Sequence, residues 1–156
     1  MSLPSVYFES TIPSYLVAKA SRDHVLRGQQ EATRRWWDEK RAEFSCHVSA
    51  FVEIEIVRGH PDAAEKRLKS IAGIPRLASS PEVMHLAERI LASGLIPLKA
   101  AMDASHIAVA TVHGMELLLT WNCTHIHNVF IHRRISRICA LEGYECPEIC
   151  TPFDLL

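Results

Sequence analysis

The chain has 156 residues, the size of one domain built around a single hydrophobic core. Hydrophobic residues make up 48% and charged residues 22%, a composition that excludes extended disorder. The net charge of -1 excludes an overall positive field, so contact with nucleic acid would rely on a local basic patch or on bound cations.

Cysteine usage and apolar runs indicate the compartment. The five cysteines form no CxxC pair, and their odd number suits a reducing compartment better than a disulfide framework. No apolar run approaches the ~20 residues that cross a membrane, and no basic stretch followed by a long apolar one opens the chain. We therefore expect a single cytoplasmic domain over residues 1–156 with no membrane contact.

The expected elements alternate between strands and helices. The first are a strand over residues 5–8, helices over 13–20 and 23–40, and a strand over 43–46. Later helices are expected over 49–58, 61–72, 81–93, 99–113 and 128–142, with short strands over 74–77, 115–120 and 145–149. This alternation predicts an α/β fold with a mainly parallel sheet covered by helices.

Glycine, proline and capping residues support these boundaries. Five glycines each follow a predicted helix, where a left-handed stop is needed: Gly59, Gly73, Gly94, Gly114 and Gly143. Pro61 and Pro81 stand where a first helical turn begins, and Ser80 and Asn128 can cap the helices that follow them. Only the segment Val52–Ile56 is ambiguous, because its apolar and acidic residues alternate as in a strand.

Two polar residues come directly after apolar strands. Glu9 follows Val6–Phe8, and Asn122 follows Leu117–Trp121. Parallel strands end at one shared edge, which is where open α/β sheets bind their ligands. Glu9 and Asn122 are therefore candidates for one site.

Three further acids are candidates for the same site. Asp103 shares a helical stripe with Ile107 and Ala110, so its carboxylate faces packed apolar surface as a metal ligand, a helix cap or a partner of Lys99. Glu53 and Glu55 point about 200° apart on a helix, so only one of them can face the site. Periodicity does not choose between the two. Carboxylates gathered in one cleft repel each other unless a hard cation such as Mg²⁺ or Mn²⁺ neutralises them.

Four motifs in order resemble the PIN-domain nucleases, especially the VapC-type toxins of type II toxin–antitoxin systems. They are Val6-Tyr7-Phe8-Glu9-Ser10-Thr11, Glu55-Ile56-Val57-Arg58-Gly59, Asp103-Ala104-Ser105-His106-Ile107-Ala108 and Leu118-Leu119-Thr120-Trp121-Asn122. The resemblance covers nearly the whole chain and favours Glu55 over Glu53. Glu9 stands where the family usually has Asp, and Asn122 stands where it usually has a fourth acid.

The resemblance implies a PIN-like three-layer fold and cleavage of RNA with Mg²⁺ or Mn²⁺. Glu9, Glu55 and Asp103 would bind the metal, Asn122 would complete the catalytic set, and Ser10 and Thr120 would support these residues by hydrogen bonds. The partners it implies are an RNA substrate, a cognate antitoxin protein and a second copy of the chain in a homodimer. The alternative hypothesis is a catalytically weak or inactive PIN-like module that binds RNA or protein.

Other clusters have ordinary interpretations beside their functional ones. His125 and His127, near Cys123 and His132, suggest zinc, although no second ligand pair completes a recognisable motif. Two basic groups suggest contact with RNA phosphates or, more simply, solvated helix faces: Arg34, Arg35, Lys40 and Arg41 around Trp36 and Trp37, and Arg133, Arg134 and Arg137. We expect the tryptophans mainly to pack in a core or a subunit interface.

Overall fold

A five-stranded parallel sheet forms the centre of the molecule. The computed structural model describes residues 2–156, and its strand order is β3-β2-β1-β4-β5, with every neighbouring pair parallel. The strands are β1 (Ser5–Phe8), β2 (Ser45–Ser49), β3 (Arg76–Leu77), β4 (Leu117–Leu119) and β5 (Glu148–Cys150). The predicted α/β class and parallel sheet are confirmed.

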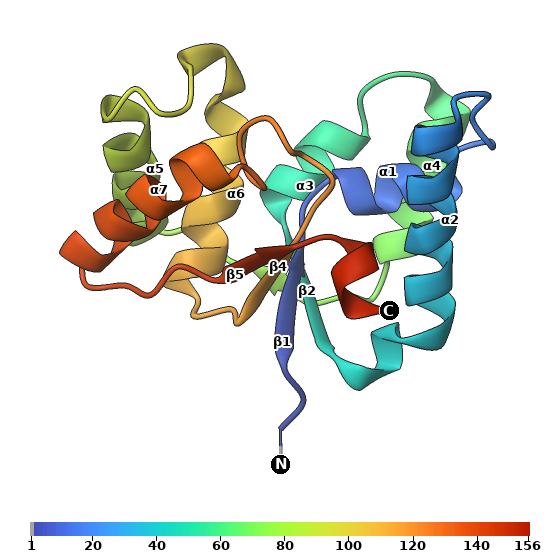
Figure 1. The fold of residues 1–156 in the computed structure, drawn as a ribbon, viewed down its shortest axis with the longest axis horizontal. Coiled ribbons are helices and arrows are strands. Elements are labelled where there is room, and N and C mark those ends of the chain that lie inside the picture. Colours follow the sequence, from blue (N-terminus) through green and yellow to red (C-terminus); the bar gives the residue numbers. More distant parts are fainter. Residues whose placement is uncertain (1) are drawn as a thin grey trace.

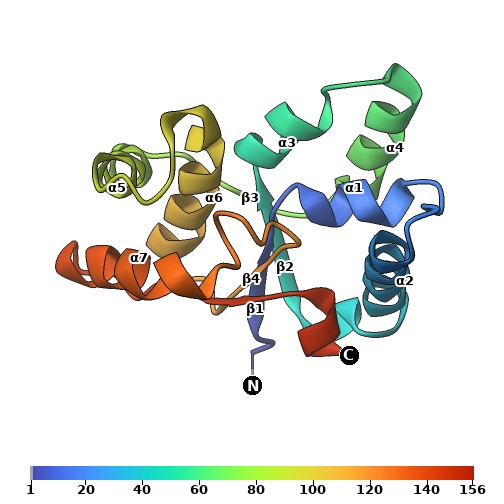
Figure 2. The ribbon, with the colours of Figure 1, turned by 45° about the horizontal axis from the view of Figure 1, so that its top comes forward.

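Helices cover both faces of this sheet. Figures 1 and 2 show α5, α6 and α7 on one side of the strands and α1, α2 and α4 on the other, with α3 beyond the end of the sheet to which β1 runs. The helices are α1 (Thr11–Val17), α2 (His24–Glu39), α3 (Ala50–Ile56), α4 (Pro61–Ile71), α5 (Pro81–Ala92), α6 (Ala101–Val112) and α7 (Val129–Leu141). Short 3₁₀ turns span Arg41–Glu43, Leu98–Ala100 and Pro152–Leu155. No helix within residues 2–156 combines the length and the apolar character needed to span a bilayer.

The core lies between the sheet and its two helical layers. Both faces of β1 are buried, because Val6, Tyr7 and Phe8 are fully enclosed. Trp36 of α2 packs edge-on against Phe8, with 5.5 Å between the ring centroids. The expectation that a tryptophan packs in the core is confirmed at Trp36, which is 0% exposed.

Helix punctuation follows the sequence closely. All five glycines predicted to stop helices have positive φ, from 69° at Gly114 to 91° at Gly59, a region that favours glycine. Ser80 accepts a hydrogen bond from the N–H of Val83, and Asn128 accepts one from the N–H of Phe130. The predicted caps are therefore confirmed.

Several boundaries differ from the prediction, and the strands expected over 74–77, 115–120 and 145–149 form at Arg76–Leu77, Leu117–Leu119 and Glu148–Cys150. The first helix begins at Thr11 rather than residue 13 and ends at Val17, where Arg34 donates to the carbonyls of Leu16 and Ala18. The second strand covers Ser45–Ser49 rather than 43–46, because residues 41–43 form a 3₁₀ turn. Another 3₁₀ turn delays the start of α6 to Ala101.

The ambiguous segment Val52–Ile56 belongs to helix α3. Val52 and Ile56 are buried on one helical face at spacing i, i+4, whereas Ile54 is 47% exposed. The alternation of apolar and acidic residues is therefore no strand signal here. The helix places Glu53 and Glu55 on different sides of α3, as predicted for a helical segment.

Candidate functional site

Glu9 is a buried carboxylate at the carboxyl edge of the sheet. Glu9 directly follows β1, and its backbone N–H donates to the carbonyl of Leu119 at 3.1 Å. The residue is 3% exposed. Its Oε1 accepts hydrogen bonds from the N–H of Thr11 at 3.0 Å, the hydroxyl of Thr11 at 2.5 Å and the hydroxyl of Thr120 at 2.8 Å. The supporting bond expected from Thr120 is thus formed.

Burial governs the charge of Glu9. It raises the pKa of the Glu9 carboxyl above its ordinary value, although nearby His106 and the hydroxyls of Thr11 and Thr120 act in the opposite direction. Within residues 2–156, Oε2 of Glu9 accepts no hydrogen bond, in contrast to Oε1. A buried carboxylate with one free oxygen is suited to a cation.

Glu55, rather than Glu53, faces Glu9. Oε1 of Glu55 accepts a hydrogen bond from the hydroxyl of Ser10 at 2.6 Å, so the support expected from Ser10 is also formed. Glu53 instead pairs with Arg76 at the start of β3. The choice of Glu55 that the motif resemblance favoured therefore agrees with the orientation of both side chains.

His106 completes this group from α6. Its Nε2 is hydrogen-bonded to Glu55, and its Nδ1 lies 2.6 Å from Oη of Tyr7, which in turn lies 2.7 Å from Oγ of Ser49. An ionised Glu55 only accepts hydrogen bonds, so Nε2 carries the hydrogen, and in the neutral ring Tyr7 donates to Nδ1. The chain from Ser49 to Glu55 thus fixes both the ring and the carboxylate.

The same contacts set the charge of Glu55. Burial is the largest single influence and opposes ionisation, but the hydrogen bond and charge of His106, with help from Ser10 and Arg58, outweigh it and lower the pKa of Glu55. The two carboxyls therefore differ: Glu55 ionises readily, whereas Glu9 does so reluctantly. Glu55 is hydrogen-bonded to His106, whereas Glu9 accepts hydrogen bonds only from hydroxyl and amide groups. A bound cation would therefore lower the pKa of Glu9 more than that of Glu55.

Glu9, Glu55 and His106 together fit a metal ion. Each offers one ligand atom, and these atoms lie within 4.8 Å of one another, the sole such group of three His, Cys, Asp or Glu residues within residues 2–156. Carboxylate oxygens suit Mg²⁺ and Mn²⁺, and His106 adds an imidazole ligand, which shifts the preference toward transition metals such as Mn²⁺, only when Nε2 gives up its hydrogen. The sequence motif contained His106, but His106 was not predicted as a site residue.

Asp103 and Asn122 occupy the same edge but bond elsewhere. Oδ2 of Asp103 lies 2.8 Å from Nδ1 of His125, and the side chain is 13% exposed. This pair replaces the suggested partnership with Lys99, and metal binding by Asp103 stays a prediction. Oδ1 of Asn122 accepts from the N–H of His125 at 3.1 Å, so the amide organises the loop after β4.

Apart from the pairing of His125 with Asp103, the other predicted clusters do not join the group of Glu9, Glu55 and His106. Within the described part of the chain, Cys123, His125, His127 and His132 form no group of three potential ligands, so the zinc hypothesis has no support there. In the first basic group, Arg35 pairs with Glu39, and the guanidinium of Arg41 lies 4.4 Å from the Trp37 ring centroid. These contacts favour the ordinary interpretation of that group.

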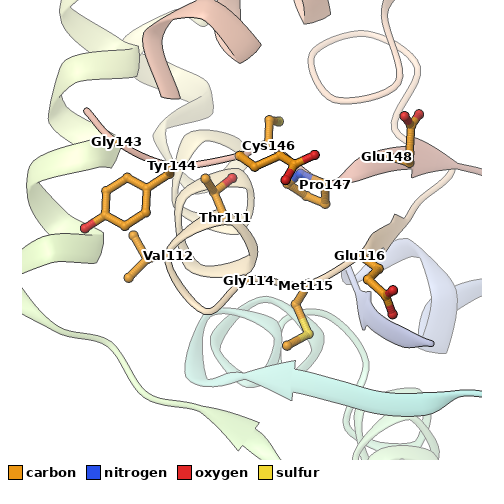
Figure 3. A pocket seen from close by; sticks show the side chains of 11 residues that line it. Thr111, Val112, Gly114, Met115, Glu116, Gly143, Tyr144, Cys146, Pro147 and Glu148 are labelled. Carbon is orange, nitrogen blue, oxygen red and sulfur yellow. The ribbon is translucent and has the colours of Figure 1, made fainter. Parts of the chain in front are cut away.

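A separate cavity lies at the opposite end of the sheet. Its volume is about 450 Å³, and it is bounded by residues before β4 and β5, among them Met115, Glu116, Tyr144 and Cys146 (Figure 3). None of the three clustered ligands lines it. Its acidic walls and its position at the amino ends of the strands separate it from the site.

Comparison of the sequence with models of known protein families finds no match, and comparison with curated proteins finds none either. The functional argument therefore rests on the geometry of the carboxyl edge and on the motif resemblance.

Proposed function

We propose that this chain is a divalent-metal-dependent endoribonuclease with a PIN-like fold. The observation that carries the proposal is the convergence of Glu9, Glu55 and His106 within 4.8 Å at the carboxyl edge of a parallel sheet. The substrate class comes from the four-motif resemblance. That resemblance extends the proposal to a toxin component, active as a homodimer and silenced by a cognate antitoxin protein.

Glu9 and Glu55 would hold the metal, with His106 beside them. When bound, a divalent ion would neutralise the carboxylates, polarise a phosphodiester and lower the pKa of a water molecule. Hydrolysis adds that water to phosphorus and breaks one P–O ester bond, whose oxygen leaves with a proton. Mn²⁺ is the expected ion, ahead of Mg²⁺, if Nε2 of His106 gives up its hydrogen and joins the carboxylates.

The protein's own residues contribute fixed geometry. Thr11 and Thr120 hold Glu9 through one oxygen and leave the other free, while Ser10 and His106 orient Glu55. Outer contacts of this kind position metal ligands and tune their basicity. Asp103 lies one helical turn before His106 on α6, so it is a third carboxylate for the same edge once it separates from His125.

The test is cleavage of a mixed pool of RNA by purified protein with Mn²⁺, with Mg²⁺ and with EDTA. We expect metal-dependent cutting that Glu9→Gln and Asp103→Asn abolish. Glu53→Gln is the matched control, because Glu53 lies on the same helix as Glu55 and points away from the site. Equal inertness of wild type and all variants at high metal would reject the nuclease proposal.

One observation favours the non-catalytic alternative. Only two carboxylates meet in the cluster, because Asp103 is paired with His125 and Asn122 carries no charge. A module that binds RNA without cutting it would retain its affinity in EDTA and show no metal-dependent products. The same RNA pool, assayed for binding as well as cleavage, separates the two functions.

A further inference from the structure

A second cavity lies beside the carboxyl edge, between α1 and α4. Its volume is about 520 Å³, and its walls include Ser14 and Lys19 on one side and Lys66 and Arg67 on the other. Figure 2 shows these two helices side by side, next to α3. The cavity is therefore distinct from the metal cluster and from the acidic cavity at the far end of the sheet.

The cations of this cavity have no acidic partner. Within residues 2–156, no carboxylate lies within 4.0 Å of Lys19, Lys66 or Arg67, whereas Lys69 of the same helix pairs with Glu65 at 3.1 Å. Asp62 also lines the cavity, but its side chain is 85% exposed and lies 3.9 Å from Nδ1 of His60. The remaining positive charge is available to an anionic ligand.

Arg67 is held in place for such a ligand. Its Nε donates to the carbonyl of Ile56 at 2.9 Å, and its Nη2 donates to the carbonyl of Arg58 at 2.7 Å. These two bonds fix the plane of the guanidinium and leave Nη1 without a hydrogen bond in the described chain. A guanidinium fixed in this way loses little further side-chain freedom when it binds an oxyanion.

The amino end of α4 adds a second favourable feature. Its positive dipole end adjoins the cavity through Ala63, and anions are stabilised at such ends. The side chain of His60 occupies the N–H of Asp62 at 3.2 Å, and Pro61 has no N–H. This helix end therefore contributes its dipole, while the hydrogen-bond donors come from Lys19, Lys66 and Nη1 of Arg67. Together with the positive charge and the bounded volume, they make the chemistry of a phosphate site.

The cavity and the metal cluster share one face of α1. The N–H of Ser14 donates to the carbonyl of Ser10 at 3.3 Å, and Ser10 is the residue whose hydroxyl binds Glu55. Ser14 lies four residues further along, a rise of about 6 Å, and it lines the cavity. On the facing side, the charge of Arg58 lowers the pKa of Glu55, and the carbonyl of Arg58 accepts a hydrogen bond from Arg67.

We infer that the cavity between α1 and α4 binds a backbone phosphate of a single-stranded nucleic acid, one or more nucleotides away from the phosphodiester held at Glu9 and Glu55. This inference rests on the proposed function for the identity of the strand. The shared chemistry, an oxyanion, also fits a free nucleotide or inorganic phosphate. A strand spanning both places would be positioned by phosphate contacts rather than by base recognition.

The experiment measures binding without cleavage. Fluorescence anisotropy follows a labelled single-stranded RNA with wild type, Lys66→Ala and Lys69→Ala, in EDTA and over a series of salt concentrations. Lys69→Ala is the matched control, because it removes the same charge from the same helix at a residue that pairs with Glu65 and does not line the cavity. Thermal melting checks that all three proteins are folded.

We expect Lys66→Ala to weaken RNA binding about threefold and to reduce the salt slope by about 0.7, while Lys69→Ala matches wild type. Equal affinities and equal slopes in the two variants would overturn the inference. If millimolar inorganic phosphate or a mononucleotide displaced the labelled RNA as strongly as unlabelled RNA does, the ligand of the cavity would be a small free anion and not a strand. Failure of the proposed function has a different signature, namely binding that depends on Lys66 without any metal-dependent cleavage.

Discussion

Replacing Glu9 by glutamine is the sharpest test of the metal site. The amide keeps the size of the side chain, and its oxygen can still accept the bonds that Thr11 and Thr120 donate to Oε1. The substitution removes only the charge of a carboxylate that is 3% exposed and that burial makes hard to ionise. We expect the Glu9→Gln protein to fold normally and to lose metal binding.

The magnitude follows from the size of the chain. A ligand at one hundred times its Kd stabilises a folded protein by about 2.7 kcal/mol. For 156 residues, the entropy of unfolding near Tm is roughly 0.33 kcal/mol/K, so this free energy corresponds to a rise in Tm of about 8 °C. Wild type should show that rise with saturating Mn²⁺, and Glu9→Gln should show none. In EDTA at neutral pH, Glu9→Gln should melt above wild type, because it no longer buries a carboxylate charge.

Differential scanning calorimetry with Mn²⁺, with Ca²⁺ and with EDTA measures both effects. Glu53→Gln should keep the full metal-induced rise, since Glu53 pairs with Arg76 outside the cluster. The reasoning would be refuted if Glu9→Gln gained as much stability from Mn²⁺ as wild type. It would also be refuted if Glu9→Gln melted below wild type in EDTA, because the buried charge would then be stabilising.

The remaining predictions concern the network behind the site and the thiols. Tyr7→Phe should cost about 1–3 kcal/mol in urea denaturation, because it leaves Nδ1 of buried His106 unpaired, and should weaken Mn²⁺ binding about 10- to 100-fold in a titration. As pH rises from the ordinary carboxyl pKa toward the raised pKa of Glu9, metal-free wild type should lose stability relative to Glu9→Gln, because the folded state keeps a proton that the unfolded state has released. Urea titrations at several pH values should show that difference, and equal pH dependence would contradict it. Iodoacetamide should modify Cys146 before the more exposed Cys123, because the neighbouring Cys139 thiol lowers the pKa of Cys146 whereas burial raises that of Cys123. Peptide mass spectrometry over time decides the order, and faster labelling of Cys123 would show that exposure alone controls reactivity.

The fold could be predicted largely because local signals agree along this chain. The last five helices, α3 to α7, each stop at a glycine with positive φ, and Ser80 and Asn128 cap the helices that follow them. The errors are short shifts at element ends, and those of β2 and α6 lie at 3₁₀ turns, which have no strong sequence pattern. At Val52–Ile56 the tertiary environment decided, because burial of Val52 and Ile56 on one face required a helix.

The site was predictable only in part, because its contacts join distant segments. Strand ends placed Glu9 at the carboxyl edge, and the motif resemblance selected Glu55. No local pattern indicates that His106 bridges Tyr7 and Glu55, since these residues are separated by 99 and 51 positions in the chain. Likewise, pairing of Asp103 with His125 depends on how the loop after β4 folds back toward α6.

The sheet order also determines when the site can exist during synthesis. Glu9 lies near the start of the chain, yet Thr120, which donates to its carboxylate, comes 111 residues later, and β4 must join β1 before the two meet. At about 5–20 residues per second, a ribosome needs roughly 6–22 s to add those residues. For that time the nascent chain carries Glu9 without the hydroxyl of Thr120 that donates to its carboxylate. Whatever chemistry this edge performs is therefore confined to chains in which β4 has been made and has paired with β1.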